Sequence, residues 1–391
     1  MNKSMEKRAP AARARMVPAV ALLAATVALL AACSSGSSTS SGGQSSGGSP
    51  SSTASAQVTA ARQATADALR QPASIPLTTL LTTAPPTGKT FVFLQCELAQ
   101  CKTFEEGVAA ATAALGWHLK VLSFQNANPA TLTSAMNQAL QYHPVGVAFT
   151  GLPQAVWQSE VAVYKNAGVP LIPAYSGPVK RDSTVIADIG AASEPDYGRI
   201  LANWFIVDSK GVGRALSFRA DDFAPLKQFS DSFDATVKAN CSGCSVTDLN
   251  ATIPQVESGQ AVSAIVSALQ KDPSIRYVVA CDAPFVDGLP AALRAAGLYG
   301  KIKIVGGGAT SVEEKGLQTG SFTALTSLAQ RYTGWLMVDA AVRHLEGMTI
   351  APSDGGEPIQ LLTKTSLQAA SDSYDYPANY PAEFRALWRL K

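Results

Sequence analysis

The chain has 391 residues, of which 47% are hydrophobic and 15% are charged, and its formal net charge is +2. These values exclude a small disulfide scaffold and a disordered chain, and so low a charge offers no basic surface for nucleic acid. Residues 1–32 contain five basic residues and one acidic residue, which leaves 26 basic and 28 acidic residues and a net charge of −2 elsewhere. The basic excess therefore belongs to the N-terminal segment.

The N-terminal segment has the pattern of an export signal. A positively charged start is followed by an apolar stretch from Val17 to Leu30 and by small residues before Cys33. This order is typical of a secretory signal peptide. The fourteen apolar residues fall short of the ~20 that a membrane-spanning helix requires, which disfavours a transmembrane anchor. The basic residues of the start are Lys3, Lys7, Arg8, Arg13 and Arg15.

Leu30-Ala31-Ala32-Cys33 resembles the lipobox of bacterial lipoproteins. In that family the cysteine is lipidated on its thiol and becomes the mature N-terminus. The resemblance implies a signal peptide over residues 1–32, lipidation of Cys33, and a place on the outer, extracytoplasmic face of the bacterial cell membrane.

A tether and a lead-in follow the signal. Residues 34–55 hold 12 Ser, five Gly and two Thr, a composition that behaves as flexible coil with a reach of about 25 Å. We assign residues 33–56 to a lipid-anchored linker. Residues 57–70 have the composition of a short helix, and four prolines break the chain before Gly88. Residues 57–87 are therefore an N-terminal helix and a Pro-rich lead-in.

From Gly88 onward, short β-branched or aromatic runs alternate with helical stretches. The clearest helix is Pro129–Tyr142, with Asn128 at the N-cap position and one apolar face. The alternation predicts parallel sheets covered by helices on both faces, and some 300 residues favour two lobes. The predicted strands are Thr90–Gln95, Leu119–Phe124, Val145–Phe149, Pro170–Pro173, Thr184–Ala187, Ala215–Phe218, Tyr277–Ala280, Ile302–Val305 and Phe322–Leu325.

Several stretches resemble the type I periplasmic binding proteins, and particularly their sugar-binding branch. They cover residues 88–391 in the order of that family. The stretches are Ala114-Leu115-Gly116-Trp117, Val145-Gly146-Val147-Ala148-Phe149, Ala167-Gly168-Val169-Pro170-Leu171-Ile172, Ala295-Ala296-Gly297, Ile304-Val305-Gly306, Gly334-Trp335, Val338-Asp339 and Gly347. The resemblance implies an α/β fold with two doubly wound parallel-sheet lobes, joined by a three-strand hinge that closes on a ligand.

The resemblance also implies boundaries for the lobes. The three crossings fall near Asp188, Ala329 and Leu362. Lobe 1 would then contain residues 88–188 plus 329–362, and lobe 2 residues 189–328 plus 363–391. In doubly wound sheets, ligands bind beyond the carboxyl ends of the strands, so the loops at those ends are the expected site.

Sugar-binding members hold hydroxyl groups with charged and amide side chains and stack aromatic faces on the ring. Where the family usually has polar residues, this sequence has Thr150, Tyr175, Phe229 and Gly308, while Asp282 keeps a polar anchor. The family's hinge Gln falls near Leu328, with Gln330 two residues away as a substitute. The resulting ligand-binding candidates are Gln95, Phe104, Thr150, Tyr175, Phe223, Phe229, Asp282, Phe285, Gly308 and Gln330.

These departures indicate a pocket less polar than a typical monosaccharide site, because buried hydroxyl groups without partners are costly. An aromatic compound, a small organic acid or amine, or a modified sugar would fit it. The alternative is that the aromatic candidates are core residues. Asp282 would pair a cationic ligand or a hydroxyl group, or it would act as a cap at the strand end.

Five cysteines remain besides Cys33, and export places them where disulfides are permitted. Cys96 and Cys101 bracket the loop after the first strand, and Cys241 and Cys244 bracket a turn between a helix and a strand. We expect a disulfide in each pair. Cys281 lies in an apolar run and is expected to be a buried free thiol.

The sequence contains no nucleophile elbow, no metalloprotease helix and no phosphate loop, so we expect no catalysis, cofactor or metal. The resemblance implies transport: a small-molecule ligand, an ABC permease as membrane partner, no nucleic acid, and a monomer. A sensor that presents its closed form to a signalling partner is the alternative, and an enzyme built on a binding fold is a third possibility. Fold alone does not choose among them.

Overall fold

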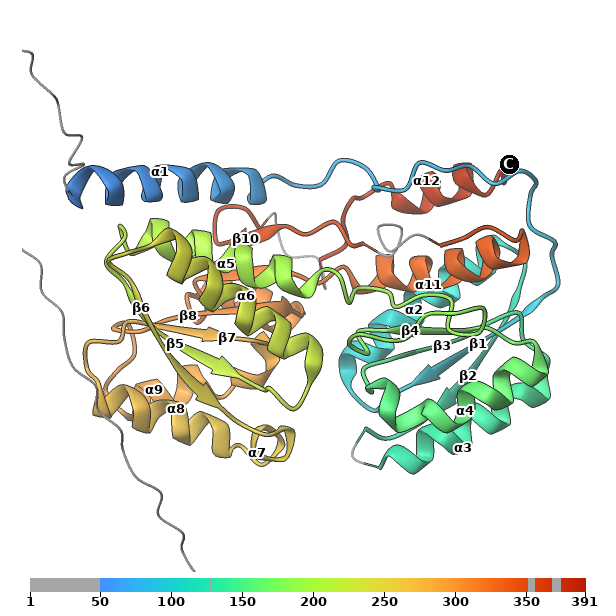
Figure 1. The fold of residues 1–391 in the computed structure, drawn as a ribbon, viewed down its shortest axis with the longest axis horizontal. Coiled ribbons are helices and arrows are strands. Elements are labelled where there is room, and N and C mark those ends of the chain that lie inside the picture. The colour runs from blue at the N-terminus through green and yellow to red at the C-terminus, as the bar shows by residue number, and fades with distance from the viewer. Residues whose placement is uncertain (1–49, 127, 351–355, 368–373) are drawn as a thin grey trace, which may run out of the picture. The chain divides into compact units, whose positions relative to one another are not determined.

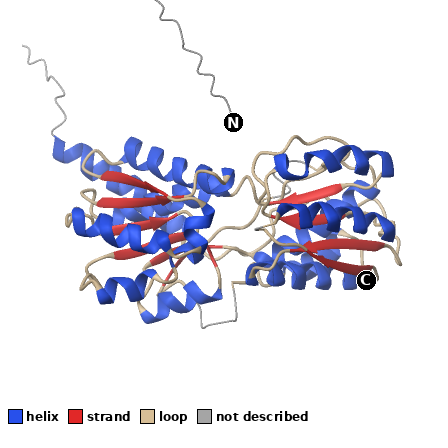
Figure 2. Ribbon diagram, turned by 90° about the horizontal axis from the view of Figure 1, so that it is seen from below, coloured by secondary structure: helices blue, strands red, loops and turns tan. Residues whose placement is uncertain are grey.

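The computed structural model describes residues 50–126, 128–350, 356–367 and 374–391. These residues form two α/β lobes, each with a sheet between layers of helices (Figures 1 and 2). The doubly wound architecture predicted from the sequence is therefore confirmed.

The first lobe contains a parallel sheet in the order β2-β1-β3-β4. Along β1, Phe91 and Phe93 face one apolar cluster, and Val92 and Leu94 face another. Both faces are buried, which is why this strand is a continuous apolar run. The strands are β1 (Thr90–Gln95), β2 (His118–Ser123), β3 (Val147–Thr150) and β4 (Leu171–Ala174). The helices are α2 (Ala99–Ala114), α3 (Pro129–Ala139), α4 (Gln154–Ala167) and α11 (Gln330–Leu345).

The second lobe contains a six-stranded sheet in the order β10-β9-β8-β7-β5-β6. Its strands are β5 (Arg214–Arg219), β6 (Ser245–Asn250), β7 (Tyr277–Ala280), β8 (Lys303–Ala309), β9 (Ala324–Ser327) and β10 (Leu361–Thr363). Its helices are α5 (Glu194–Asp208), α6 (Ala224–Asn240), α7 (Ile253–Glu257), α8 (Gln260–Lys271), the 3-10 helix η2 (Ala283–Val286), α9 (Leu289–Ala295) and α10 (Ser311–Thr319). β10 pairs antiparallel with β9, so this sheet is mixed rather than purely parallel.

Local elements differ from the sequence prediction in four places. The predicted strand Thr184–Ala187 is not a strand, and only its Val185 forms an isolated bridge, to Leu171 of β4. Neither β6 nor β10 is among the predicted strands, because β6 has no buried residue to mark it and β10 has only three residues. The predicted helix at 129–142 ends at Ala139 and continues as the 3-10 turn η1 (Leu140–Tyr142), and the Asn128 side chain makes no capping hydrogen bond.

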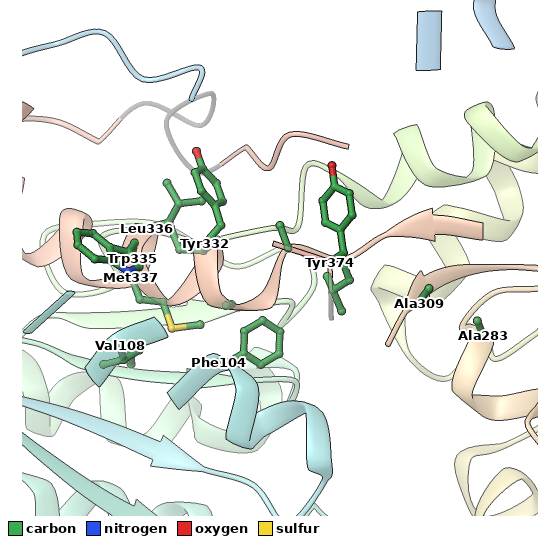
Figure 3. Packing of buried hydrophobic residues seen from close by; sticks show 14 of the residues in the cluster. Phe104, Val108, Ala283, Ala309, Tyr332, Trp335, Leu336, Met337 and Tyr374 are labelled. Carbon is green, nitrogen blue, oxygen red and sulfur yellow. The ribbon is translucent and has the colours of Figure 1, made fainter. Parts of the chain in front are cut away.

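Helices α2 and α11 pack closely because glycine lies at their contact. A Cβ atom on Gly334 would lie 2.5 Å from the backbone nitrogen of Val108 and 2.6 Å from the carbonyl oxygen of Phe104. Figure 3 shows Phe104 and Val108 of α2 beneath α11, with Tyr332 on the opposite side of that helix. Residues far apart in sequence thus build the core of the first lobe.

The C-terminal helix α12 (Tyr380–Leu387) packs on α11 of the first lobe. The Trp335 and Trp388 rings stack with centroids 5.3 Å apart, and the Trp388 indole nitrogen donates to Asp339 Oδ1 at 2.7 Å. The expected assignment of 363–391 to the second lobe therefore does not hold for α12. The third crossing also precedes Leu362, which already lies in β10 of the second sheet.

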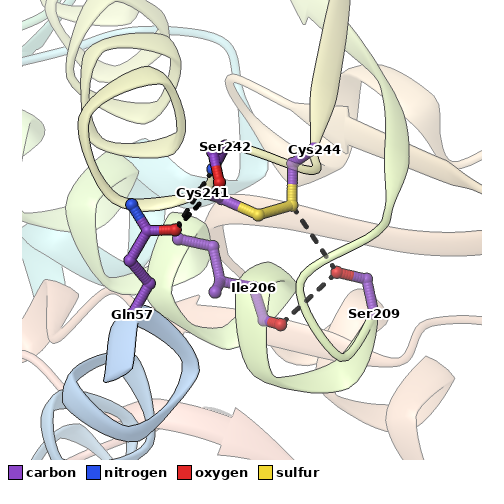
Figure 4. Close-up of a disulfide and its surroundings, with 6 residues drawn as sticks. All are labelled: Gln57, Ile206, Ser209, Cys241, Ser242 and Cys244. Carbon is purple, nitrogen blue, oxygen red and sulfur yellow. Dashed lines mark hydrogen bonds between the residues drawn. A yellow bond between two sulfur atoms is a disulfide. The ribbon is translucent and has the colours of Figure 1, made fainter. Parts of the chain in front are cut away.

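Helix α1 (Pro50–Ala68) begins before the predicted helix and includes residues 50–55, which we had assigned to the linker. It packs along α5, where Ala61 joins the core of the second lobe. Its Gln57 accepts hydrogen bonds from the backbone nitrogen and hydroxyl of Ser242, both at 3.3 Å (Figure 4). The burial of apolar surface on α5 explains why this helix is not part of a free tether.

The signal peptide, Cys33 and most of the linker lie outside the described residues. Within the described part of the chain, no helix has the length and apolar character needed to cross a membrane.

Candidate functional site

The first-lobe candidates lie at the carboxyl ends of the strands, as expected from the fold. Gln95 ends β1, Thr150 ends β3, and Tyr175 directly follows β4. Phe104 comes from α2, and its ring centroid lies 5.7 Å from that of Tyr175. The structure thus brings Phe104 and Tyr175 into contact at one sheet edge.

The disulfide Cys96–Cys101 lies at the same edge and confirms the prediction. Both cysteines are buried, and Cys101 Sγ lies 3.3 Å from Thr150 Oγ1. The disulfide therefore fixes the loop between β1 and α2 against the end of β3. The second predicted disulfide, Cys241–Cys244, closes the turn between α6 and β6 (Figure 4). Cys281 is free and buried.

Tyr175 adopts a left-handed backbone conformation, with φ of +50°. Its ring packs over Gly190, where any Cβ atom would collide with the ring. Its hydroxyl donates to Glu357 and lies 3.3 Å from Thr333 Oγ1. A strained backbone at a strand end and a glycine beneath the ring together direct this side chain toward Glu357.

Glu357 is the centre of a buried hydroxyl cluster that the sequence analysis did not find. It accepts hydrogen bonds from Tyr175 and Thr333 of the first lobe and, at 2.7 Å, from the hydroxyl of Tyr197 on α5 of the second lobe. Burial raises the pKa of Glu357, while the three hydroxyl donors act in the opposite direction. Burial, with Glu357 next, also raises the pKa of Tyr175 and of Tyr197. One carboxyl group therefore connects three segments of the two lobes.

The second-lobe candidates are divided between the sheet edge and the core. Asp282 follows β7, and its Oδ1 lies 3.0 Å from the position that a Cβ atom on Gly308 would take. Phe285 lies in η2, and Phe223 precedes α6; both are partly buried. Phe229 is only 1% exposed and packs in the apolar core of the lobe.

Phe229 is therefore a core residue, which was the alternative interpretation of the aromatic candidates. Phe104 is a core residue as well, because it is 3% exposed and packs in the large apolar cluster that includes Phe91 and Phe93. Gln330, the first residue of α11, is 2% exposed, and its amide nitrogen has no hydrogen-bond partner in the described part of the chain. It does not join the Tyr175 cluster through any described hydrogen bond. The structure thus groups Tyr175 with Phe104, and Asp282 with Gly308.

Acidic side chains that the sequence analysis does not single out act electrostatically on Asp282. Glu194, at the start of α5, is 7% exposed, and burial followed by the charges of Asp282 and Glu357 raises its pKa. Burial raises the pKa of Asp282 well above its usual value, with Glu313 and Asp287 adding to the effect. Glu313 accepts hydrogen bonds from the backbone and hydroxyl of Thr310, so it also caps α10. In the sequence, an acidic residue in the first turn of a helix looks the same whether it caps the helix or binds a ligand.

A cavity of ≈ 330 Å³ lies elsewhere on the second lobe. It is lined by residues of α9 and α10, among them Arg294 and Lys315, and by Phe322 from the segment after α10, and none of the predicted site residues contributes to it. Within the described ranges, no three His, Cys, Asp or Glu side chains are grouped in a way that would hold a metal ion.

The chain has two α/β lobes, and polar and aromatic side chains lie at the carboxyl ends of their strands. This arrangement is that of a two-lobed binding protein. The family model described as a periplasmic binding protein domain matches residues 98–349. This match covers more than half of the chain, and the chain belongs to that family. No curated protein sequence matches this chain.

Solved structures show the same fold. An ABC sugar transporter subunit from Rhodobacter sphaeroides has a TM-score of 0.60 and 20% identity, covering 71% of this chain and 99% of its own. GanP, a glucose-galactose binding protein from Geobacillus stearothermophilus, has a TM-score of 0.61 and 18% identity, covering 72% and 99%. A 5-methylthioribose transporter solute binding protein from Thermotoga lettingae has a TM-score of 0.61 and 15% identity, covering 72% and 89%. At these identities the likeness establishes the fold alone.

Proposed function

We propose that this chain is the substrate-binding component of an ABC importer, which captures a small solute between its lobes by hinge closure. The observation that carries the proposal is the hydroxyl cluster on Glu357, where Tyr175 of one lobe and Tyr197 of the other bind the same carboxylate. This contact joins the two lobes, and both lobes carry candidate side chains at their strand ends. Both features are expected of a receptor that closes on its ligand about a hinge. Family membership supports binding rather than catalysis.

The proposal includes the place of the protein in the cell. Cys33 would carry the lipid, and the Ser/Gly-rich residues that follow would tether a monomeric receptor to the outer face of the cell membrane. Its partner there would be an ABC permease, and it would not bind nucleic acid. Docking of α1 on α5 supports a tether that ends before Pro50 rather than at residue 56.

The ligand class follows from the side chains at the site. Tyr175 supplies an aromatic face beside Thr150 at one sheet edge, and Asp282 supplies a carboxyl group at the other. With Phe104 and Phe229 in the core, the site is less aromatic than the sequence indicated. A polar organic solute, either sugar-like or a small compound with one apolar face, suits this combination.

A thermal-shift screen of the full chain tests the proposal. The protein is purified oxidised in detergent, stripped of bound ligand, and screened against sugars, polyols, amino acids, nucleosides and small aromatic acids and amines. A ligand at 100 times its dissociation constant stabilises the fold by about 2.7 kcal/mol. No stabilisation by any compound contradicts a solute-capturing receptor and favours a sensor of another kind of ligand.

One substitution tests whether a compound found in this screen binds at the proposed site. We expect Asp282→Ala to weaken the affinity for the bound compound by ~1 kcal/mol or more. The control is Glu257→Ala, an exposed position on α7. Equal affinities in the two variants would locate the ligand elsewhere.

A further inference from the structure

Three neighbouring segments at the amino edge of the second sheet are rich in basic residues. They lead into β5, β7 and β8, which are adjacent parallel strands, so the segments lie at one edge. Residues 208–214, 271–276 and 297–303 contain six Lys or Arg and two Asp, a net charge of +4. Residues 33–391 as a whole carry −2, so the overall charge hides this concentration. All six basic side chains are exposed: Lys210, Arg214, Lys271, Arg276, Lys301 and Lys303.

The backbone holds these segments, which we call the basic face, side by side. The backbone nitrogen of Arg276 donates to the carbonyl oxygen of Arg214 at 3.1 Å, and the nitrogen of Lys303 donates to the carbonyl oxygen of Arg276 at 2.8 Å. Of the six basic side chains, only that of Lys303 forms an ion pair within the described residues, with Asp208 at 2.6 Å. Cations held together with few counter-charges repel one another, and an anionic partner relieves that repulsion.

Two exposed apolar side chains lie within the basic face. Val212, between Lys210 and Arg214, is 72% exposed, more than any other large hydrophobic residue that the structure describes. Tyr299 is 39% exposed, and the Arg294 guanidinium lies over its ring, 4.0 Å from the centroid. Basic side chains beside exposed aliphatic and aromatic groups are typical of surfaces that bind an anionic bilayer.

The N-terminal tether enters the fold at the same place. Gln57 of α1 accepts hydrogen bonds from Ser242, in the turn before β6 (Figure 4). A Cβ atom on Gly211, in the first segment of the basic face, would lie 2.9 Å from the Val58 side chain. Helix α1 begins seven residues before Gln57, about 10 Å along the helix axis. The residues that connect the fold to Cys33 therefore start close to the basic face.

A lipid on Cys33 would keep the basic face near the bilayer, where a high effective concentration favours weak contacts. Each Lys or Arg near an anionic bilayer strengthens binding about fivefold, and an apolar side chain such as Val212 adds to this in the headgroup region. We propose that the basic face docks on anionic phospholipid headgroups and orients the second lobe on the membrane; this rests on the lipid anchoring proposed above. Asp282 lies at the opposite, carboxyl edge of that sheet, so docking leaves it free for a solute.

The full, lipid-bearing chain in vesicles tests the inference. A fluorescent non-canonical amino acid is placed at Val212, and quenching by a nitroxide-labelled lipid measures its contact with the bilayer. The control label is at Val163, which is 40% exposed on α4 of the first lobe. We expect quenching at Val212 to be at least threefold stronger with phosphatidylglycerol in the vesicles than with phosphatidylcholine alone, and no such difference at Val163. Equal quenching at Val212 in both vesicles overturns the inference, because the anchor alone would then explain it.

Charge reversal connects the contact to the basic face. Arg214→Glu combined with Lys271→Glu should abolish the difference between the two kinds of vesicle at Val212. Lys120→Glu combined with Lys165→Glu makes the same change in net charge at exposed positions of the first lobe and should keep the difference. The opposite result in either double variant overturns the inference. If the first variant fails to fold, the wild type in about 0.5 M NaCl replaces it, because salt screens surface charges, and a difference that persists there also overturns the inference.

Flotation separates this inference from the anchoring on which it rests. Failure of the full chain to float with phosphatidylcholine vesicles would refute the lipid anchor and, with it, the docking. Flotation without preferential quenching at Val212 would leave the anchor standing and refute the docking alone. Solute binding in the thermal-shift screen does not depend on either result.

Discussion

The hydroxyl of Tyr197 provides a direct test of the cluster on Glu357. It donates to Glu357 Oε2 at 2.7 Å, and the residue is 2% exposed, so water does not replace the bond when the hydroxyl is removed. Tyr197→Phe deletes this one oxygen and leaves the ring in its packing. The carboxylate keeps its bonds from Tyr175 and Thr333.

The expected loss follows from the charge on the acceptor. A hydrogen bond to a charged group contributes about 1.5–3 kcal/mol, against about 0.5–1.5 kcal/mol for a neutral pair. We therefore expect Tyr197→Phe to lower the free energy of unfolding by about 1.5–3 kcal/mol at pH 7. Equilibrium urea unfolding of the full chain measures it.

Tyr277→Phe is the matched control. Tyr277 also donates to a carboxylate at 2.7 Å, on Asp208, but Lys303 binds the same carboxylate near the surface. Because Asp208 keeps a charged partner and solvent, we expect a loss below about 1 kcal/mol. Equal losses in the two variants, or a loss under ~0.5 kcal/mol at Tyr197, would show that Glu357 is not the charged acceptor described here.

Two further predictions concern packing and titration. Gly334→Ala should destabilise the first lobe by about 1–3 kcal/mol, because its Cβ atom would press on the backbone at Val108; a melting temperature equal to wild type would contradict the close approach of α11 and α2. Burial raises the pKa of Glu314 from 4.5 to about 7, so the folded chain holds a proton there that the unfolded chain has released, and the free energy of unfolding falls as pH rises through that window. Glu314→Gln keeps an acceptor for the backbone nitrogen of Tyr374 and should reduce this fall by up to about 3 kcal/mol; identical pH profiles from urea unfolding at pH 4.5 and pH 7.5 would refute the buried carboxyl.

Elements with a strong local signal were predicted well. The apolar run at Thr90–Gln95 forms a strand over those same residues, and the helix beginning at Pro129 buries Leu132, Ala135, Met136 and Ala139, the positions of its apolar stripe. Both disulfides join cysteines close in sequence, where spacing alone restricts the pairing. Such features depend on residues near one another in the chain, and one sequence contains that information.

The site was predicted only in part, because its contacts join residues that are far apart in the chain. The position of Tyr175 follows from the strand before it, but its partner Glu357 lies 182 residues away in the sequence and belongs to no periodic segment. Glu194 has the pattern of an ordinary acidic residue in a first helical turn, and only its burial distinguishes it. Phe229 shows the converse, because a predicted ligand-facing ring proved to be core.

The sequence by itself determined the alternation of strands and helices, the family, and the two disulfides. The tertiary structure decided which carboxyl groups are buried, where α1 and α12 dock, and which aromatic rings are buried. Periodicity and spacing record local geometry, whereas the energy of a carboxylate or a ring depends on every group packed around it, and at Glu194 and Glu357 those groups come from distant parts of the chain.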